Sequence, residues 1–102
     1  MKILSVFYKH NEISLHNNLL GKKSVYYNGN LVASKWVVFG AKLTFDVIED
    51  NEEITYTAGF SYNDYGGYCG DVWRDYEPLV LSSLKSCWRP KRPQEQYESD
   101  FV

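Results

Sequence analysis

Apolar residues in this chain recur at every second position, which is the periodicity of a β-strand with one buried face. The clearest alternation runs through residues 43–47 and 54–60. Residues 3–8 and 31–38 are dense in apolar and β-branched side chains. No long window before residue 78 shows the 3.6-residue period of a helix. The pattern therefore predicts an all-β protein.

Turn signals separate these segments. The strongest is Asn28-Gly29, because both residues tolerate the positive φ that a two-residue type I′ hairpin turn requires. Polar clusters at residues 9–11, 49–52 and 74–77 are predicted to close three further hairpins. Four hairpins give seven or eight short antiparallel strands. We expect them to form a meander-rich sandwich or a small barrel.

The length of 102 residues allows one domain with one core. We expect that domain to occupy residues 1–88. Residues 89–102 are mostly polar and contain Pro90 and Pro93, which predicts an exposed, flexible tail. Residues 78–88 fit either a strand or a short helix, because their leucine spacing matches neither period well.

Aromatic residues make up 17% of the chain, and their positions divide them into two groups. The first group falls on predicted inward strand positions, where it needs no function beyond packing. The expected core residues are Phe7, Val25, Trp36, Phe45, Val47, Ile54, Tyr56 and Phe60. The second group lies in and beyond the tyrosine- and glycine-rich segment 62–70.

We predict that segment 62–70 is a surface recognition loop. Tyrosine offers a large contact area at a small cost in conformational entropy, while glycine and asparagine let a backbone adapt. Loops of this composition usually lie on the surface. The predicted binding residues are Tyr62, Tyr65, Tyr68, Trp73 and Tyr76. The alternative is that these rings only cap the open end of a sandwich.

Charge is distributed unevenly along the chain, although the net charge is only −2. Residues 1–45 hold six lysines and one glutamate, whereas residues 46–77 hold nine acidic residues and one arginine. Either oppositely charged strands pair within a sheet, or the surface carries two signs and favours self-association. The basic segment 85–92 is short, so we do not expect the coherent basic groove that nucleic-acid binding requires.

The cysteines and histidines form no recognisable chemical motif. Cys69 and Cys87 are not in a CxxC pattern, and His10 and His16 are far from them in sequence, so we expect no metal and no cofactor. Two reduced thiols are the expected state, with a disulfide as the alternative in an exported protein. The acidic cluster at residues 49–53 lacks the spacing of a calcium loop.

Several residues between positions 21 and 47 follow an order that is found in a known family. They are Gly21-Lys22, Val25-Tyr26, Asn28-Gly29, Trp36, Gly40, Thr44-Phe45 and Val47. In this order the segment resembles the β-sandwich domain of the Fas apoptosis inhibitory molecule family, although the spacing between Trp36 and Gly40 departs from the family's pattern. The resemblance implies an all-β, non-enzymatic domain that interacts with proteins, and it supplies no catalytic residues.

Together these patterns predict a small non-catalytic binding module that uses the loop at residues 62–70. The expected partner is another protein or a second copy of the chain, with a carbohydrate as the alternative. Competing functions are a small β-barrel enzyme with Cys69 as nucleophile or with carboxylates as acid and base, and a carrier of apolar ligands. The N-terminal apolar run stops at Lys9 without a cleavage site, and no segment approaches 18 apolar residues. We therefore expect a cytoplasmic protein that does not enter a membrane.

Overall fold

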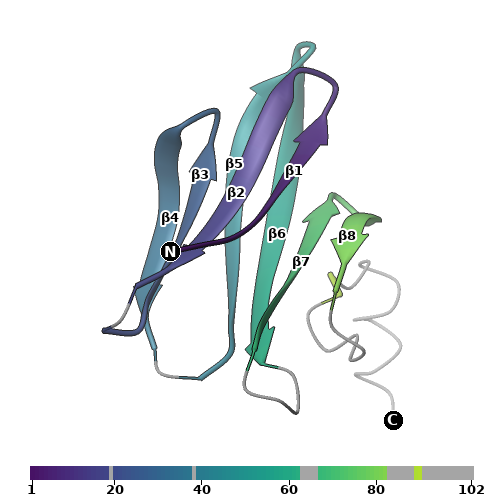
Figure 1. Ribbon diagram of the computed structural model, residues 1–102. Coiled ribbons are helices and arrows are strands. Elements are labelled where there is room, and N and C mark those ends of the chain that lie inside the picture. The colour runs from purple at the N-terminus through teal and green to yellow at the C-terminus, as the bar shows by residue number, and fades with distance from the viewer. Residues whose placement is uncertain (19, 38, 63–66, 83–88, 91–102) are drawn as a thin grey trace, which may run out of the picture.

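The computed structural model describes residues 1–18, 20–37, 39–62, 67–82 and 89–90, and every regular element within them is a β-strand (Figure 1). The strands are β1 (Lys2–Tyr8), β2 (Asn11–Asn17), β3 (Lys22–Tyr27), β4 (Asn30–Trp36), β5 (Ala41–Glu49), β6 (Glu52–Tyr62), β7 (Tyr68–Arg74) and β8 (Glu77–Leu81). The prediction of an all-β chain with seven or eight short strands is confirmed.

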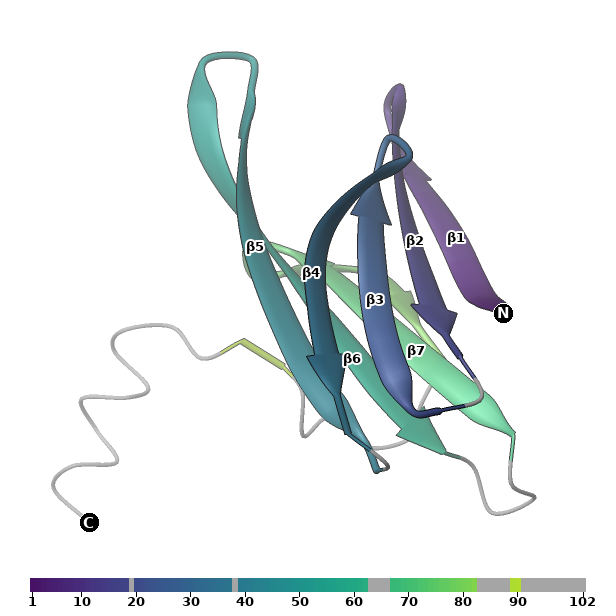
Figure 2. The same cartoon turned by 90° about the vertical axis from the view of Figure 1, so that its left-hand side faces the viewer.

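The strands form two four-stranded antiparallel meanders. Sheet A has the order β1-β2-β3-β4 and sheet B the order β5-β6-β7-β8. Figure 2 shows sheet A, coloured purple to blue, lying over sheet B, coloured teal to green. Of the two predicted architectures, a sandwich and a small barrel, the fold is therefore the sandwich. Each meander arises because consecutive strands are joined by turns too short for any other connection.

All four predicted hairpin turns are present. Asn28 and Gly29 have φ angles of 52° and 83°, as the expected type I′ turn requires. Asp50 and Asn51 show the same pattern, with φ angles of 52° and 66°. Each of the two other turns contains one residue with positive φ. Local turn chemistry thus fixes which strands pair within each sheet.

The core lies between the two sheets. Its buried cluster consists of Ile13, Leu15, Val25, Leu43, Phe45, Ile54, Tyr56, Ala58, Phe60 and Val72. Five of the eight residues predicted for the core belong to this cluster, and Val47 packs against it. The sheets approach closely at Gly70 of β7, where an added Cβ would lie 2.6 Å from Cδ2 of Leu4 and 2.9 Å from Cδ2 of Leu15.

Two of the predicted core residues are on the surface instead. Phe7 is 66% exposed, because the inward face of β1 contains Val6, which pairs with the buried Ile13. Trp36 is 61% exposed, and it pairs with Lys22, whose Nζ lies 5.7 Å from the centre of the indole ring. Both predictions were wrong because alternation alone does not state which face of a strand is covered.

The C-terminal part of the predicted domain is described in part. Residues 77–81 form the strand β8, so the first four residues of the ambiguous segment 78–88 are extended. Residues 83–88 lie outside the described residues, as does the predicted tail apart from Arg89 and Pro90. No helix in the described part of the chain is long and apolar enough to cross a membrane.

Candidate binding site

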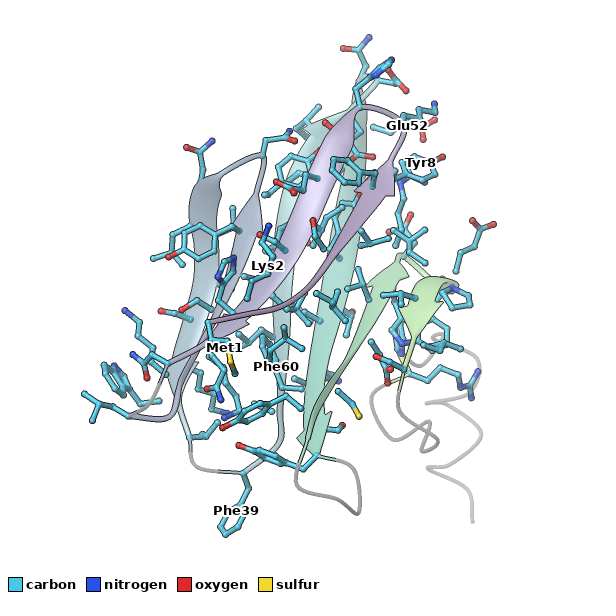
Figure 3. All side chains as sticks on the ribbon, in the orientation of Figure 1. Met1, Lys2, Tyr8, Phe39, Glu52 and Phe60 are labelled. Carbon is cyan, nitrogen blue, oxygen red and sulfur yellow. The ribbon has the colours of Figure 1, made fainter. Side chains whose placement is uncertain are left out.

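At one end of the sandwich, the ends of β2, β6 and β7 and residues of the loops after β2 and β4 line a pocket of about 400 Å³. We call it the end pocket. It is open to solvent, and it is lined by Asn17, Asn18, Leu20, Gly21, Phe39, Tyr62 and Tyr68. Figure 3 shows Phe39 projecting from this end of the molecule. The lining residues therefore come from both sheets.

Tyr62 and Tyr68 form one wall of the end pocket. Tyr62 is the last residue of β6 and Tyr68 the first of β7, and they are direct partners across the two strands. Their ring centres lie 5.0 Å apart, with the planes tilted by 50°. The two residues are 39% and 41% exposed. Each ring is therefore fixed by the other and still accessible to a ligand.

The opposite wall is a loop that Asn18 holds in shape. Its Oδ1 accepts hydrogen bonds from the backbone N–H groups of Leu20, at 2.9 Å, and Lys22, at 2.8 Å. Its carbonyl accepts a third from the N–H of Gly21, which has a φ angle of 92° that favours glycine. These bonds fix the backbone of Leu20, Gly21 and Lys22 in the free protein, while the side chain of Leu20 is exposed.

Asn17 contributes a buried acceptor that has no partner. The residue is only 3% exposed, and its Oδ1 has no hydrogen-bond partner within the described part of the chain. Its backbone groups, by contrast, are hydrogen-bonded to Met1: the N–H of Asn17 donates to the carbonyl oxygen of Met1, and the carbonyl oxygen of Asn17 accepts from the N-terminal ammonium group. A buried acceptor without a donor costs about 1–3 kcal/mol. Asn17 is also one of the residues that line the end pocket.

Lys23 places a buried positive charge behind the tyrosine wall. The residue is 1% exposed. Its Nζ donates to the carbonyl oxygen of Val37 at 2.9 Å and to the hydroxyl oxygen of Tyr62 at 3.3 Å, and it lies 5.6 Å from the centre of the Tyr62 ring. Among the described residues, no carboxylate forms an ion pair with it. The charge therefore acts on the pocket with little local compensation.

The five predicted binding residues do not form one surface. Tyr62 and Tyr68 share the end pocket, while Tyr65 lies outside the described residues. Trp73 is buried, and Tyr76 lies in the turn after β7. Tyr76 is separated from Tyr68 by the length of β7, roughly 20 Å at about 3.3 Å per residue.

The residues that share the end pocket with these tyrosines could not be predicted from the sequence. Asn17, at the end of β2, and the loop residues Leu20 and Phe39 are distant in sequence from Tyr62 and Tyr68. No local spacing shows that sheet packing brings them together. The run of asparagine and glycine between positions 17 and 21 is a turn signal, but a turn signal does not identify a site. Lys23 was missed because lysine is rarely buried.

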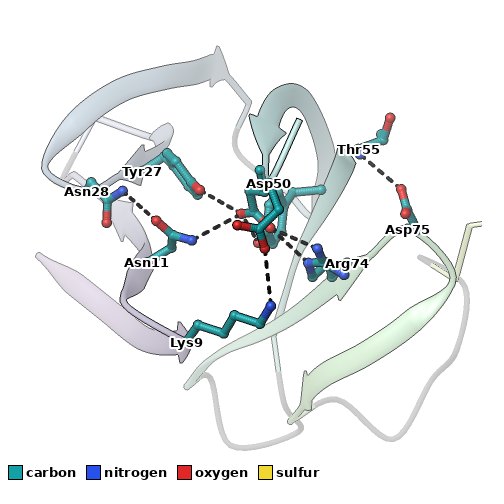
Figure 4. Close-up of polar contacts among 10 residues, drawn as sticks. Lys9, Asn11, Tyr27, Asn28, Asp50, Thr55, Arg74 and Asp75 are labelled. Atoms are coloured by element: carbon teal, nitrogen blue, oxygen red, sulfur yellow. Dashed lines mark hydrogen bonds and ion pairs between the residues drawn. The ribbon is translucent and has the colours of Figure 1, made fainter. Parts of the chain in front are cut away.

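A second polar cluster lies at the other end of the sandwich, around the buried carboxylate of Glu49, the last residue of β5. Figure 4 shows two of its members, Tyr27 and Arg74. Its Oε2 accepts hydrogen bonds from the hydroxyls of Tyr27 and Tyr56, each at 2.6 Å. Its Oε1 accepts from Nε of Arg74 at 3.0 Å and pairs with Nη2 at 3.0 Å. Tyr27 belongs to sheet A and the other residues to sheet B, so the cluster ties the sheets together.

The pKa shifts in this cluster favour one fixed protonation state. Burial raises the pKa of Glu49, but the combined hydrogen bonds and charge of Tyr27, Tyr56 and Arg74 outweigh burial and lower it below 4.5. Burial and the hydrogen bond to Glu49 raise the pKa of both tyrosines above 10. At neutral pH the carboxylate stays ionised and the tyrosines stay protonated, which suits a structural clamp better than acid–base catalysis.

The lowered pKa of Glu49 predicts a loss of stability in acid. A carboxylate whose pKa is lower in the folded state stabilises the fold above its unfolded pKa, near 4.5 here, and this contribution is lost as pH falls through the folded pKa. We therefore expect the stability difference between the natural protein and Glu49→Gln to shrink as pH falls below 4.5. Urea unfolding at a series of pH values measures it. A difference that stays constant down to pH 2 would contradict this assignment.

The described residues do not assemble a Cys–His site. Cys69 lies on the outer face of sheet B, because the next residue, Gly70, faces the core. His16 lies on the outer face of sheet A, with its ring centre 4.8 Å from that of Tyr26. His10 is in the β1–β2 turn and shares a surface pocket with Glu49. Within this part of the chain, no group of His, Cys, Asp or Glu residues could hold a metal ion.

Comparison with known proteins gives no family assignment. No protein-family model, curated protein or solved structure matches this chain. The resemblance of residues 21–47 to the Fas apoptosis inhibitory molecule family therefore stays a prediction. This segment runs from the loop before β3 into β5. The segment contributes Gly21 and Phe39 to the end pocket, whereas the two tyrosines of the pocket, Tyr62 and Tyr68, lie outside the segment.

Proposed function

We propose that this protein is a small non-catalytic binding domain and that the end pocket is its recognition site. The observation that carries the proposal is the meeting, in one pocket, of two accessible tyrosines and Asn17, whose buried Oδ1 has no partner among the described residues. Ligand sites combine apolar and aromatic walls with a few polar groups that fix orientation. The end pocket has this composition, and its walls are held in place by hydrogen bonds within the free chain.

The rim of the end pocket supports the same proposal. Leu20 and Phe39 are both largely exposed, and they project beside the tyrosine pair. Single exposed apolar side chains need no explanation, but a group of them around a pocket is typical of an interaction site. The Glu49 cluster, by contrast, has its hydrogen-bonding groups occupied by one another. The end pocket is therefore the better candidate of the two.

Replacing Tyr68 by alanine is expected to weaken ligand binding at least about tenfold, because an anchoring aromatic residue contributes more than about 1 kcal/mol. The measurement is a surface plasmon resonance screen of a library of small soluble fragments over the immobilised full chain. Tyr76→Ala is the matched control, since Tyr76 is 40% exposed, like Tyr68, but lies outside the pocket. Equal losses in both variants, or no loss in Tyr68→Ala, would reject the site.

A second candidate function, self-association, is favoured by how charge divides between the sheets. Residues 1–36, which form sheet A, hold five lysines and one glutamate, whereas residues 41–81, which form sheet B, hold nine acidic residues, one lysine and one arginine. The basic strands thus lie in sheet A and the acidic strands in sheet B, so strands of opposite charge are not paired within the same sheet. Sheet A of one copy would face sheet B of another, which is a head-to-tail contact.

Association of this kind is expected to depend on salt. We expect light scattering coupled to size exclusion to show dimers or larger species at about 20 mM salt and monomers at about 500 mM, since screening shortens the range of exposed charges. Lys22→Glu should reduce the association at low salt, because Lys22 lies in a strand of the basic sheet. A monomer under both conditions would exclude this candidate and leave the end pocket unaffected.

A further inference from the structure

We propose that the ligand of the end pocket is a saccharide, with a sugar ring packed on Tyr62 and Tyr68 and with its hydroxyl groups bonded to the side-chain amide of Asn17. This inference rests on the proposed function and adds the chemical class of the ligand. The acceptor, the charge and the shape of the pocket each restrict the chemistry of the ligand.

The first step is that the ligand brings a hydrogen-bond donor. Asn17 lines the pocket, and its buried Oδ1 has no hydrogen-bond partner among the described residues. The only side-chain oxygen beside it in the sequence, Oδ1 of Asn18, is already occupied by the N–H groups of Leu20 and Lys22. Buried polar groups in proteins are nearly always hydrogen-bonded. A ligand that fits this pocket therefore offers a donor to Asn17, which narrows the choice to hydroxyl, amide and ammonium groups.

The second step is that the donor is not a cation. The ammonium group of Lys23 lies 5.6 Å from the centre of the Tyr62 ring and donates to its hydroxyl oxygen. A cationic ligand on the same ring would meet this buried charge at short range, where repulsion is weakly screened. The tyrosine pair is therefore not a cage for an ammonium group, although two adjacent aromatic rings alone would suit one. A neutral donor remains.

The third step is that the donor belongs to a ligand that is apolar on one face and polar at its edge. The tyrosines offer aromatic faces, and the amide of Asn17 offers an acceptor and a donor side by side. A pyranose ring has a face of C–H groups and an edge of neighbouring hydroxyls, each of which donates and accepts. The volume of about 400 Å³ is at the small end of ligand sites and suits one or two sugar rings.

The test is a printed array of neutral, sialylated, sulfated and uronate-containing oligosaccharides, probed with the full chain through a C-terminal epitope tag. We expect binding to a subset of spots, at least a tenfold loss in Asn17→Leu, and retention in Asn17→Asp, which keeps an acceptor. Tyr76→Ala should bind like the natural protein. Because Oδ1 of Asn17 has no partner among the residues that the structure describes, Asn17→Leu should not lower the unfolding temperature, which separates binding from folding.

Each other outcome identifies what is wrong. If fragments bind the end pocket but no oligosaccharide does, the saccharide class is wrong and the binding site stands. If neither fragments nor oligosaccharides bind, the proposed function itself is wrong. Oligosaccharide binding that Asn17→Leu leaves unchanged would place the sugar elsewhere on the protein. Binding of tetramethylammonium chloride at the tyrosine pair would contradict the argument from Lys23.

Discussion

Replacing Glu49 by alanine is expected to lower the free energy of unfolding by about 3–5 kcal/mol, which is the cost of breaking a buried ion pair by removing one partner. The change leaves the guanidinium of Arg74 without its carboxylate and the hydroxyls of Tyr27 and Tyr56 without their acceptor. It also removes the link between the sheets at this end of the sandwich. Urea unfolding followed by tryptophan fluorescence measures the effect.

Two neighbouring substitutions serve as controls for this prediction. Glu49→Gln keeps the shape and one acceptor oxygen, so it should destabilise less than alanine. Asp50→Asn removes the exposed ion pair with Lys9, at 3.2 Å, and retains a residue that tolerates the positive φ of this turn. Exposed pairs of this kind contribute little, so its effect should be near zero. A loss below about 1 kcal/mol for Glu49→Ala would show that the cluster does not clamp the sheets.

Replacing Phe60 by alanine is expected to cost about 3–5 kcal/mol, whereas Phe7→Ala should change stability by less than about 0.5 kcal/mol. Phe60 is almost fully buried between the sheets and Phe7 is 66% exposed. The two substitutions are chemically identical, and alternation along the chain predicts both residues to be in the core. Equal losses in the same unfolding assay would mean that the inner face of β1 is assigned incorrectly.

Phe7, which was predicted to lie in the core and is exposed, shows which features of this fold can be predicted from sequence. Hairpins are encoded locally, because the turn residues Asn28-Gly29 and Asp50-Asn51 can adopt the backbone that joins two strands. The face of a strand that becomes buried is encoded locally only where one face is polar. In β5 one face is polar, and the prediction that Phe45 lies in the core is confirmed. In β1 both faces carry apolar residues, so the packing of sheet A on sheet B determines which face is buried.

The residues of the candidate site also divide into those that local sequence predicts and those that it does not. Tyr62 and Tyr68 were predictable because their composition and their glycine-rich surroundings are local properties. Asn17 and Phe39 reach the same pocket through the packing of two sheets, which depends on contacts between distant residues. Lys23 is a third case, because burying a charged residue against a tyrosine hydroxyl and a carbonyl contradicts its ordinary preference for the surface.

The position of the recognition site is tested most directly by nuclear magnetic resonance on the ¹⁵N-labelled full chain. The tightest fragment from the plasmon resonance screen is titrated in, and the shift of every assigned backbone amide is followed. If the end pocket is the site, the largest changes fall on residues 17–21, Phe39, Tyr62 and Tyr68. Largest changes around Glu49, or around Tyr76, would contradict it.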